Sequence, residues 1–167
     1  RMAREAETGQ FGEAHAAYYL DFVRMNQTDH AALARELPAI LRAMEWCRDN
    51  GRHRLVVDFM WAVDEFLGAA GHTAEEKRWL RVATESARAC HDQVAAASFS
   101  HNLAMLLVEQ GDDAAALPVF GESLRLERIT RDRAGIANTL SHMAAIYERQ
   151  GNLKRAADLR RAASGKQ

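Results

Sequence analysis

Two serine–histidine pairs about forty residues apart come nearest to reactive chemistry in this chain. They are Ser100-His101 and Ser141-His142. A serine beside a histidine suggests a nucleophile with its general base. Adjacent residues on a helix point in different directions, so neither pair has that geometry. No nucleophile elbow accompanies them. We therefore expect that the chain is not an enzyme.

A second group, Cys90-His91-Asp92, contains three residue types that bind zinc. Consecutive side chains on a helix diverge, and the sequence has neither a His-Glu-x-x-His nor a Cys-x-x-Cys motif. The run is typical of a helix end followed by an N-cap aspartate. We expect no metal and no cofactor. Cys47 and Cys90 are expected to be unpaired thiols, with a disulfide as the alternative.

Glycines forty residues apart mark the elements that hold these side chains: Gly71, Gly111 and Gly151. Each suits a helix C-terminus, where a residue without Cβ adopts a left-handed conformation at little cost. The patterns between them predict eight helices, over about 11–27, 30–50, 53–70, 73–91, 93–110, 113–130, 133–150 and 152–164. No alternating run is long enough for a strand. The predicted fold class is all-α, a right-handed α-α solenoid of about four helical hairpins.

Turn and helix-breaking residues predict local detail within these helices. Asp112 and Asn152 are expected to be N-cap or turn residues, and Thr73 resembles an N-cap followed by acidic residues. Pro38 predicts a kink or a break in its helix. Pro118 fits only if its helix starts late, so we expect a local distortion there.

The residues around the glycines resemble the tetratricopeptide repeat (TPR), a helix–turn–helix hairpin. The leucine, small residue, aromatic, glycine and alanine of that family correspond here to Leu103, Ala104, Leu107, Gly111 and Ala116, and again to Met143, Ala144, Tyr147, Gly151 and Ala156. Phe120 matches a later aromatic position, whereas Arg160 departs from it. The resemblance implies one repeat domain over 1–167, with a divergent first hairpin at 11–50 and repeats at 52–91, 92–131 and 132–164.

A narrower resemblance connects the chain to the C-terminal helical arm of bacterial STAND signalling ATPases. It rests on residues 14–20 (AHAAYYL), 36–47 (ELPAILRAMEWC) and 70–80. It implies a sensor or scaffold arm of a larger cytoplasmic regulator, from which this chain is a fragment. No Gly-rich Lys-Ser/Thr loop is present, so any nucleotide hydrolysis would belong to another part of that regulator.

TPR geometry implies a concave, partner-binding groove on the first helix of each hairpin. Carried over residue by residue, it comprises Trp61, Glu65, Ser98, His101, Asn102, Met105, Glu109, Asn138, Ser141, His142, Ala145 and Arg149. Amide and imidazole groups hydrogen-bond to a peptide backbone, while Trp and Met supply apolar contact. The alternative is that His101 and His142 lie half-exposed between helices, satisfied by Asn or Ser. The set lacks the basic cluster with which chaperone-binding TPR domains clamp a carboxylate.

Composition limits the function classes further. The formal net charge is −1, so nothing indicates a nucleic-acid binder. The basic residues between 154 and 166 are interpreted as a solvated helix face in preference to a phosphate site. No apolar run is long enough to span a membrane and no signal peptide is recognised, so we expect a cytoplasmic protein.

These observations favour a protein- or peptide-binding scaffold or sensor of a bacterial signalling or transcription-regulatory protein. The alternative is a receptor for a small molecule or signalling peptide in a closed helical pocket around Trp61. An enzyme that uses histidine or zinc is a third hypothesis. The apolar stripe of the last helix predicts either further repeats or a homodimer through the C-terminal repeat, because a terminal repeat otherwise needs a polar cap.

Overall fold

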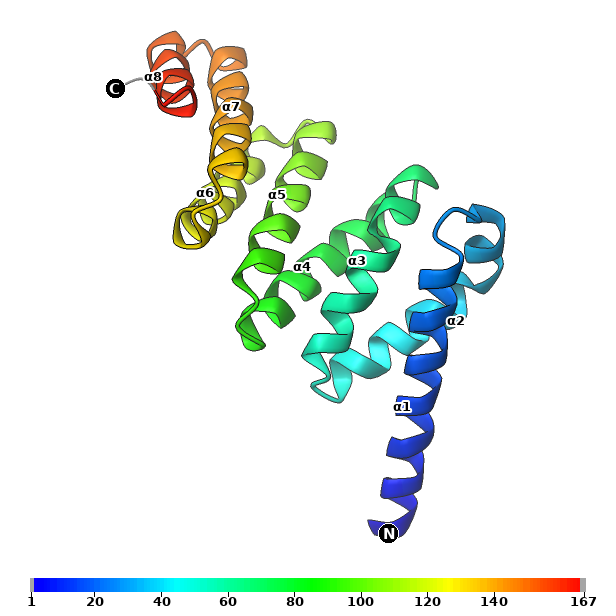
Figure 1. Ribbon diagram of the computed structural model, residues 1–167. Helices are drawn as coiled ribbons and strands as arrows, with labels where there is room; N and C mark the ends of the chain where they lie inside the picture. Colours follow the sequence, from blue (N-terminus) through cyan, green and yellow to red (C-terminus); the bar gives the residue numbers. More distant parts are fainter. Residues whose placement is uncertain (1, 166–167) are drawn as a thin grey trace. The chain divides into compact units, whose positions relative to one another are not determined.

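The computed structural model describes residues 2–165, with side chains from residue 12 onward. All regular secondary structure in this part is α-helical (Figure 1). The helices are α1 (Met2–Met25), α2 (His30–Asp49), α3 (His53–Ala69), α4 (Thr73–Ala89), α5 (Gln93–Glu109), α6 (Asp113–Thr130), α7 (Arg133–Arg149) and α8 (Leu153–Ala163). The first helix begins at residue 2, before the predicted residue 11, in a stretch rich in the helix formers Ala, Arg and Glu. Every other predicted boundary lies within two residues of the observed one.

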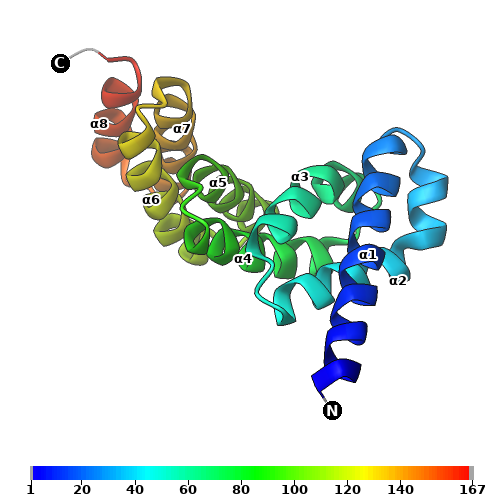
Figure 2. The ribbon, with the colours of Figure 1, turned by 60° about the horizontal axis from the view of Figure 1, so that its bottom comes forward.

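The helices pair as consecutive hairpins within two compact units, Arg1–Cys90 and His91–Gln167. In the first unit α1 pairs with α2 and α3 with α4, and both α1 and α2 pack on α3. In the second unit α5 pairs with α6 and α7 with α8, while α6 packs on α7 (Figures 1 and 2). The predicted fold class, α-hairpins of the α-α solenoid type, is confirmed.

A left-handed residue recurs every twenty positions, at the end of a helix. The series is Gly51, Gly71, His91, Gly111, Arg131 and Gly151, with φ between 59° and 77°. At Gly111 the backbone N–H donates to the Val108 carbonyl at 2.9 Å, and the N–H of Asp112 donates to the Leu107 carbonyl at 2.9 Å. This pair of bonds is a Schellman motif, which satisfies carbonyl groups at a helix end. The forty-residue period therefore contains two twenty-residue units, each a helix with its turn.

The residue after each left-handed position occupies the N-cap of the next helix. From α5 onward its side chain accepts a hydrogen bond from a backbone N–H three residues later, at Asp92, Asp112, Asp132 and Asn152. These bonds satisfy donors that a helix start leaves unpaired. The expectations for Asp92, Asp112 and Asn152 are confirmed.

Three local predictions are wrong in part, while the kink at Pro38 and the local distortion at Pro118 stay predictions. Thr73 is the first residue of α4 and not its N-cap; His72 takes that place and makes no side-chain capping bond. The predicted break at Pro38 is absent, since α2 continues through it while the neighbouring Ile40 is fully buried. The late start required by Pro118 is also absent, because α6 begins five residues before it. Each proline removes one backbone hydrogen bond, and tertiary packing holds the helix together.

Small residues predicted at the helix crossings are buried. Ala104, Ala116 and Ala144 are fully buried, and Ala156 is 1% exposed. The absence of bulk at these positions lets neighbouring helices approach closely. In the hairpin around Gly71, Asp64 and Glu76 stand where the other copies have small residues, yet Val63, Leu67, Leu80 and Ala83 are core residues. The repeat pattern therefore predicts these interior positions correctly even in this divergent copy.

The apolar stripe of α8 is covered only in part. Ala156 and Leu159 form a core cluster with residues of α6 and α7, namely Leu124, Leu140 and Ala144. Leu153 is 67% exposed, and Ala157 and Ala162 are exposed as well. The stripe that predicts a homodimer therefore keeps an exposed apolar side.

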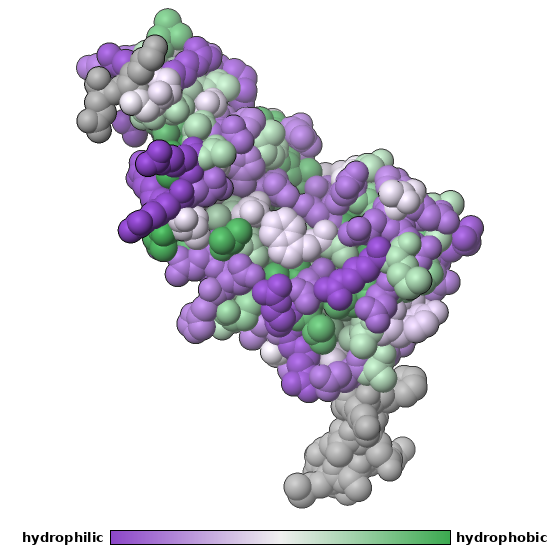
Figure 3. All heavy atoms as spheres, in the orientation of Figure 1, coloured by the Kyte–Doolittle hydropathy of each residue, from purple (hydrophilic) through white to green (hydrophobic). Residues whose placement is uncertain are grey.

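On the face shown in Figure 3, hydrophilic side chains predominate and hydrophobic ones are scattered among them. Within the described chain, no helix combines the length and the apolar character needed to cross a bilayer.

Candidate functional site: a cavity between α5 and α7

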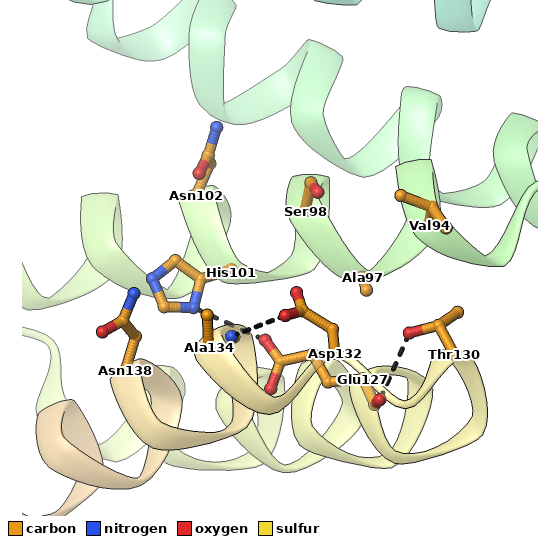
Figure 4. A pocket seen from close by; sticks show the side chains of 11 residues that line it. Val94, Ala97, Ser98, His101, Asn102, Glu127, Thr130, Asp132, Ala134 and Asn138 are labelled. Carbon is orange, nitrogen blue, oxygen red and sulfur yellow. Dashed lines mark hydrogen bonds and ion pairs between the residues drawn. The ribbon is translucent and has the colours of Figure 1, made fainter.

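A cavity of about 420 Å³ lies in the second unit, between α5 and the loop that joins α6 to α7 (Figure 4). It is lined by Val94, Ala97, Ser98, His101, Asn102, Glu127, Thr130, Asp132, Ala134, Gly135 and Asn138. The α5 residues recur at a spacing of three and four, which places them on one face of the helix. The volume falls in the range of ligand pockets, about 300–1,000 Å³.

His101 is joined to the carboxyl group of Glu127 through a threonine. Its Nδ1 atom lies 2.9 Å from the Thr139 hydroxyl, which donates to Glu127 Oε1 at 2.8 Å. A hydroxyl carries one hydrogen, so Nδ1 must donate to Thr139. The direct separation between Nδ1 and Oε1 is 3.9 Å. This relay fixes both the tautomer and the orientation of the imidazole.

Burial keeps this imidazole neutral. The pKa of His101 is lowered from its ordinary value of 6.5, first because the ring is buried and second because His142 lies beside it. The two ring centroids are 5.4 Å apart, and Phe120 contacts both rings. His101 is thus half-buried between helices and satisfied by a neighbour, which is Thr139 and not the expected Asn or Ser.

Glu127 is a carboxyl group in the interior, with 3% of the residue exposed. Besides Thr139, the Ser123 hydroxyl lies 2.9 Å from its Oε1 atom. Its Oε2 atom is buried and has no hydrogen-bond partner. A buried acceptor without a donor costs about 1–3 kcal/mol, so a ligand that supplied a donor would relieve this cost.

The first turn of α7 makes room for this carboxyl group. The Gly135 N–H donates to Asp132 Oδ1 at 2.9 Å. A Cβ atom at Gly135 would lie 2.5 Å from Asp132 Oδ2 and 3.2 Å from Glu127 Cδ. Glycine therefore allows two carboxyl groups to approach the start of α7, where the positive end of the helix dipole favours negative charge.

The structure brings together part of the predicted groove. Ser98, His101, Asn102 and Asn138 line the cavity, whereas Met105, Glu109, Ser141, His142, Ala145 and Arg149 do not. The Ser141 hydroxyl donates to the Ala137 carbonyl at 2.8 Å. Arg149 is bound to Asp113 through two hydrogen bonds, of 2.6 and 3.0 Å.

Trp61 and Glu65 lie in the first unit, along a separate hollow of about 320 Å³. Polar residues Gln27, Thr28 and His30 share its wall. Trp61 remains 47% exposed. This hollow is not a deep apolar pocket of the kind that the receptor hypothesis requires.

Sequence reasoning missed the carboxyl side of the cavity. Glu127 is not predicted because nothing local distinguishes it from Glu122, the partly exposed glutamate on the same helix. Thr139 and Ser123, its partners, are unremarkable in sequence. Asp132 did carry a signal, since it stands twenty residues after Asp112 and before another helix.

Other groups offer little reactive chemistry. Ser100 is 2% exposed, so its hydroxyl is inaccessible. Cys47 and Cys90 are both free, and burial raises the pKa of the Cys47 thiol to about 11. At neutral pH that thiol remains protonated and a poor nucleophile. In the described part of the chain, no three His, Cys, Asp or Glu side chains gather as metal ligands would.

Comparisons with known proteins agree with this geometry. Residues 93–163 match a tetratricopeptide-repeat family model. The TPR domain of Arabidopsis FLU is similar in structure, with a TM-score of 0.61 and 15% identity over 68% of this chain and 96% of that domain. BtubC (BKLC) from P. vanneervenii has a TM-score of 0.59 and 12% identity, over 95% of this chain and 73% of its own. No curated protein sequence matches the chain. The family match and the structural neighbours support a tetratricopeptide-repeat protein.

Proposed function

We propose that this chain is a non-catalytic protein- or peptide-binding scaffold whose partner binds to the second unit, across α5 and α7. One observation carries this proposal: every residue that lines the cavity, from Val94 to Asn138, falls inside the segment that matches the repeat family. Repeats of this type bind partners with the exposed faces of their helices.

The rim of the cavity suits an extended polypeptide. Asn102 points away from the Glu127 carboxyl group, and Asn138 extends from α7 toward α5 (Figure 4). An amide side chain offers both donors and an acceptor, as a peptide backbone requires. Val94, at the other end of the α5 face, is 61% exposed and supplies apolar contact area.

We further propose that this module serves a cytoplasmic bacterial signalling or transcription-regulatory protein of the STAND type. The resemblance of residues 14–20, 36–47 and 70–80 supports this context. Partner binding would then bias the arrangement of a linked effector domain. The half-exposed Trp61 does not favour the alternative of a closed receptor pocket. A homodimer through the C-terminal repeat would use the exposed apolar residues of α8, which are Leu153, Ala157 and Ala162.

A peptide selection tests the proposed binding surface. A library of linear peptides displayed on phage is selected on the folded chain, and the affinity of the best peptide is measured by calorimetry. Asn102→Ala and Asn138→Ala are expected to weaken binding by about tenfold each, because each removes hydrogen bonds to the bound backbone. Thermal unfolding of each variant checks that it remains folded.

The matched control is Arg125→Ala on α6, where Arg125 pairs with Glu122 outside the cavity. It should leave the affinity unchanged. Equal affinity of all three variants and the parent chain would reject the α5–α7 surface.

A further inference from the structure

We propose that the cavity binds a cationic side chain of the partner, a Lys ammonium or an Arg guanidinium, against the carboxyl groups of Glu127 and Asp132. This inference rests on the proposed function, because it names the part of a polypeptide that enters the site. Repeat proteins that clamp a carboxylate use basic side chains to bind an acidic group. Here acidic side chains would bind a basic group.

The first argument is the charge of the lining. Two carboxyl groups face the cavity, and none of the described residues that line it is Lys or Arg. The lowered pKa of His101 keeps its ring neutral at neutral pH, so the imidazole adds no positive charge. Glu127 and Asp132 are close enough that one Cβ atom at Gly135 would crowd both. An anion entering here would meet repulsion, whereas a cation would meet two acceptors.

The second argument is the unequal satisfaction of the Glu127 oxygens. Oε1 has two hydroxyl groups within 2.9 Å, those of Ser123 and Thr139. Oε2 has no partner, although it is buried. Glu127 therefore keeps one oxygen that no donor satisfies. An ammonium group brings three N–H donors and a guanidinium group five, and a hydrogen bond from a cation to a carboxylate is stronger than one between neutral groups.

The third argument is the mixed character of the walls. Val94, Ala97 and Ala134 are apolar residues of the lining. Lys and Arg carry methylene stems that pack on apolar surface while the charged end reaches polar groups. The Asn138 side chain, on the same lining, offers a further acceptor oxygen. A long basic side chain matches this combination better than a small hydrophilic cation does.

Blocked heptapeptides that differ only at the central residue test the inference by NMR titration of the ¹⁵N-labelled full chain. The central residue is Arg, Lys, citrulline, norleucine or Glu in a background of Ala and Gly. The Arg and Lys peptides should shift the amide signals of Gly135 and Asn138. Citrulline and norleucine keep the shape of the side chain without its charge, so they should bind about tenfold more weakly or worse. The Glu peptide should cause no shift.

Charge-removing variants give the second arm of the test. Glu127→Gln and Asp132→Asn should each weaken the Arg peptide by about tenfold. Asn is also a good N-cap residue, so Asp132→Asn keeps the start of α7 and remains informative if Glu127→Gln fails to fold. The control is Glu122→Gln, on the same helix as Glu127 but paired with Arg125 outside the cavity. It should leave the affinity unchanged.

The possible outcomes separate this inference from the proposed function. Equal binding of the Arg and citrulline peptides, or full affinity in Asp132→Asn, would overturn the cation site. Binding of a selected peptide that depends on Asn102 and Asn138 but has no basic residue would also overturn it, while leaving the scaffold function intact. Free methylguanidinium serves as a further probe. If it shifts Gly135 and no peptide does, the site takes a small cation and the inference is wrong.

Discussion

Arg131 has a backbone φ of 59°, in the left-handed region that residues with a Cβ atom rarely adopt. It occupies the position that Gly111 and Gly151 fill in the neighbouring turns. Arg131→Gly should therefore raise the free energy of unfolding by about 1 kcal/mol, because the strain of a left-handed L-residue is relieved. Urea denaturation followed by circular dichroism measures the change. Gly111→Ala, the reverse substitution at an equivalent site, should lower stability, and an unchanged or less stable Arg131→Gly would contradict the explanation.

His101 makes stability depend on pH in a defined direction. Its pKa is lowered in the folded state, and His142 from α7 and Glu127 from α6 are the titratable groups that face it. Between the lowered pKa and 6.5, the unfolded chain binds more protons at this residue than the folded chain does. The His101 contribution should be fully present above pH 6.5 and should decrease as the pH falls through and below that value.

The measurement for His101 is the unfolding free energy from pH 5 to pH 8, in the parent chain and in His101→Gln. Glutamine keeps a side-chain amide that can reach Thr139 but does not titrate in this range. The parent chain should lose more stability than the variant on acidification. Identical pH profiles would show that His101 is not the responsible group.

Residue identity explains why the sequence predicts some turns and not others. Gly71, Gly111 and Gly151 reveal the left-handed positions because glycine favours them. His91 and Arg131 adopt the same conformation with side chains that give no such signal. The capping aspartates, by contrast, can be predicted, since a short acceptor side chain before an apolar helix is a strong signal of a helix N-terminus.

At the scale of helices, two glycines inside helices have opposite environments. Gly12 of α1 lies against Trp46 of α2, so closely that an added Cβ atom would overlap the indole ring. Gly121 of α6 has no heavy atom within 4 Å of an added Cβ atom. Gly12→Ala should lower stability by about 1–3 kcal/mol through overpacking. Gly121→Ala should raise it by about 0.5–1 kcal/mol, because alanine is the better helix former.

Thermal and urea unfolding of the two variants check this pair of predictions. Gly121→Ala is the internal control for the general effect of replacing a helical glycine. A stabilising effect at both sites would mean that α1 and α2 can separate without cost at this crossing.

Helices themselves are predicted well from sequence because their signals are local. Periodic apolar positions, left-handed glycines and acidic caps all act within a few residues, and seven of the eight helices begin and end within two residues of the expected positions. The cavity depends on longer-range packing. Thr139 of α7 meets Glu127 only because α6 packs on α7, and the sequence of either helix alone does not predict that contact.

At the scale of the molecule, the two units divide the predicted groove residues between them. Trp61 and Glu65 belong to the first unit, whereas the cavity with its buried carboxyl group belongs to the second. The second unit also contains the whole of the matched repeat segment. A net charge of −1 gives the chain no general attraction for charged polymers.

The central claim is that a partner polypeptide binds to the second unit across α5 and α7. The most direct measurement is NMR mapping of the highest-affinity selected peptide on the full ¹⁵N-labelled chain. We predict that the amide signals which shift most belong to the cavity side of α5 and the first turn of α7, including Gly135, while those of α8 change little. Shifts confined to α8, or to the first unit, would contradict the claim.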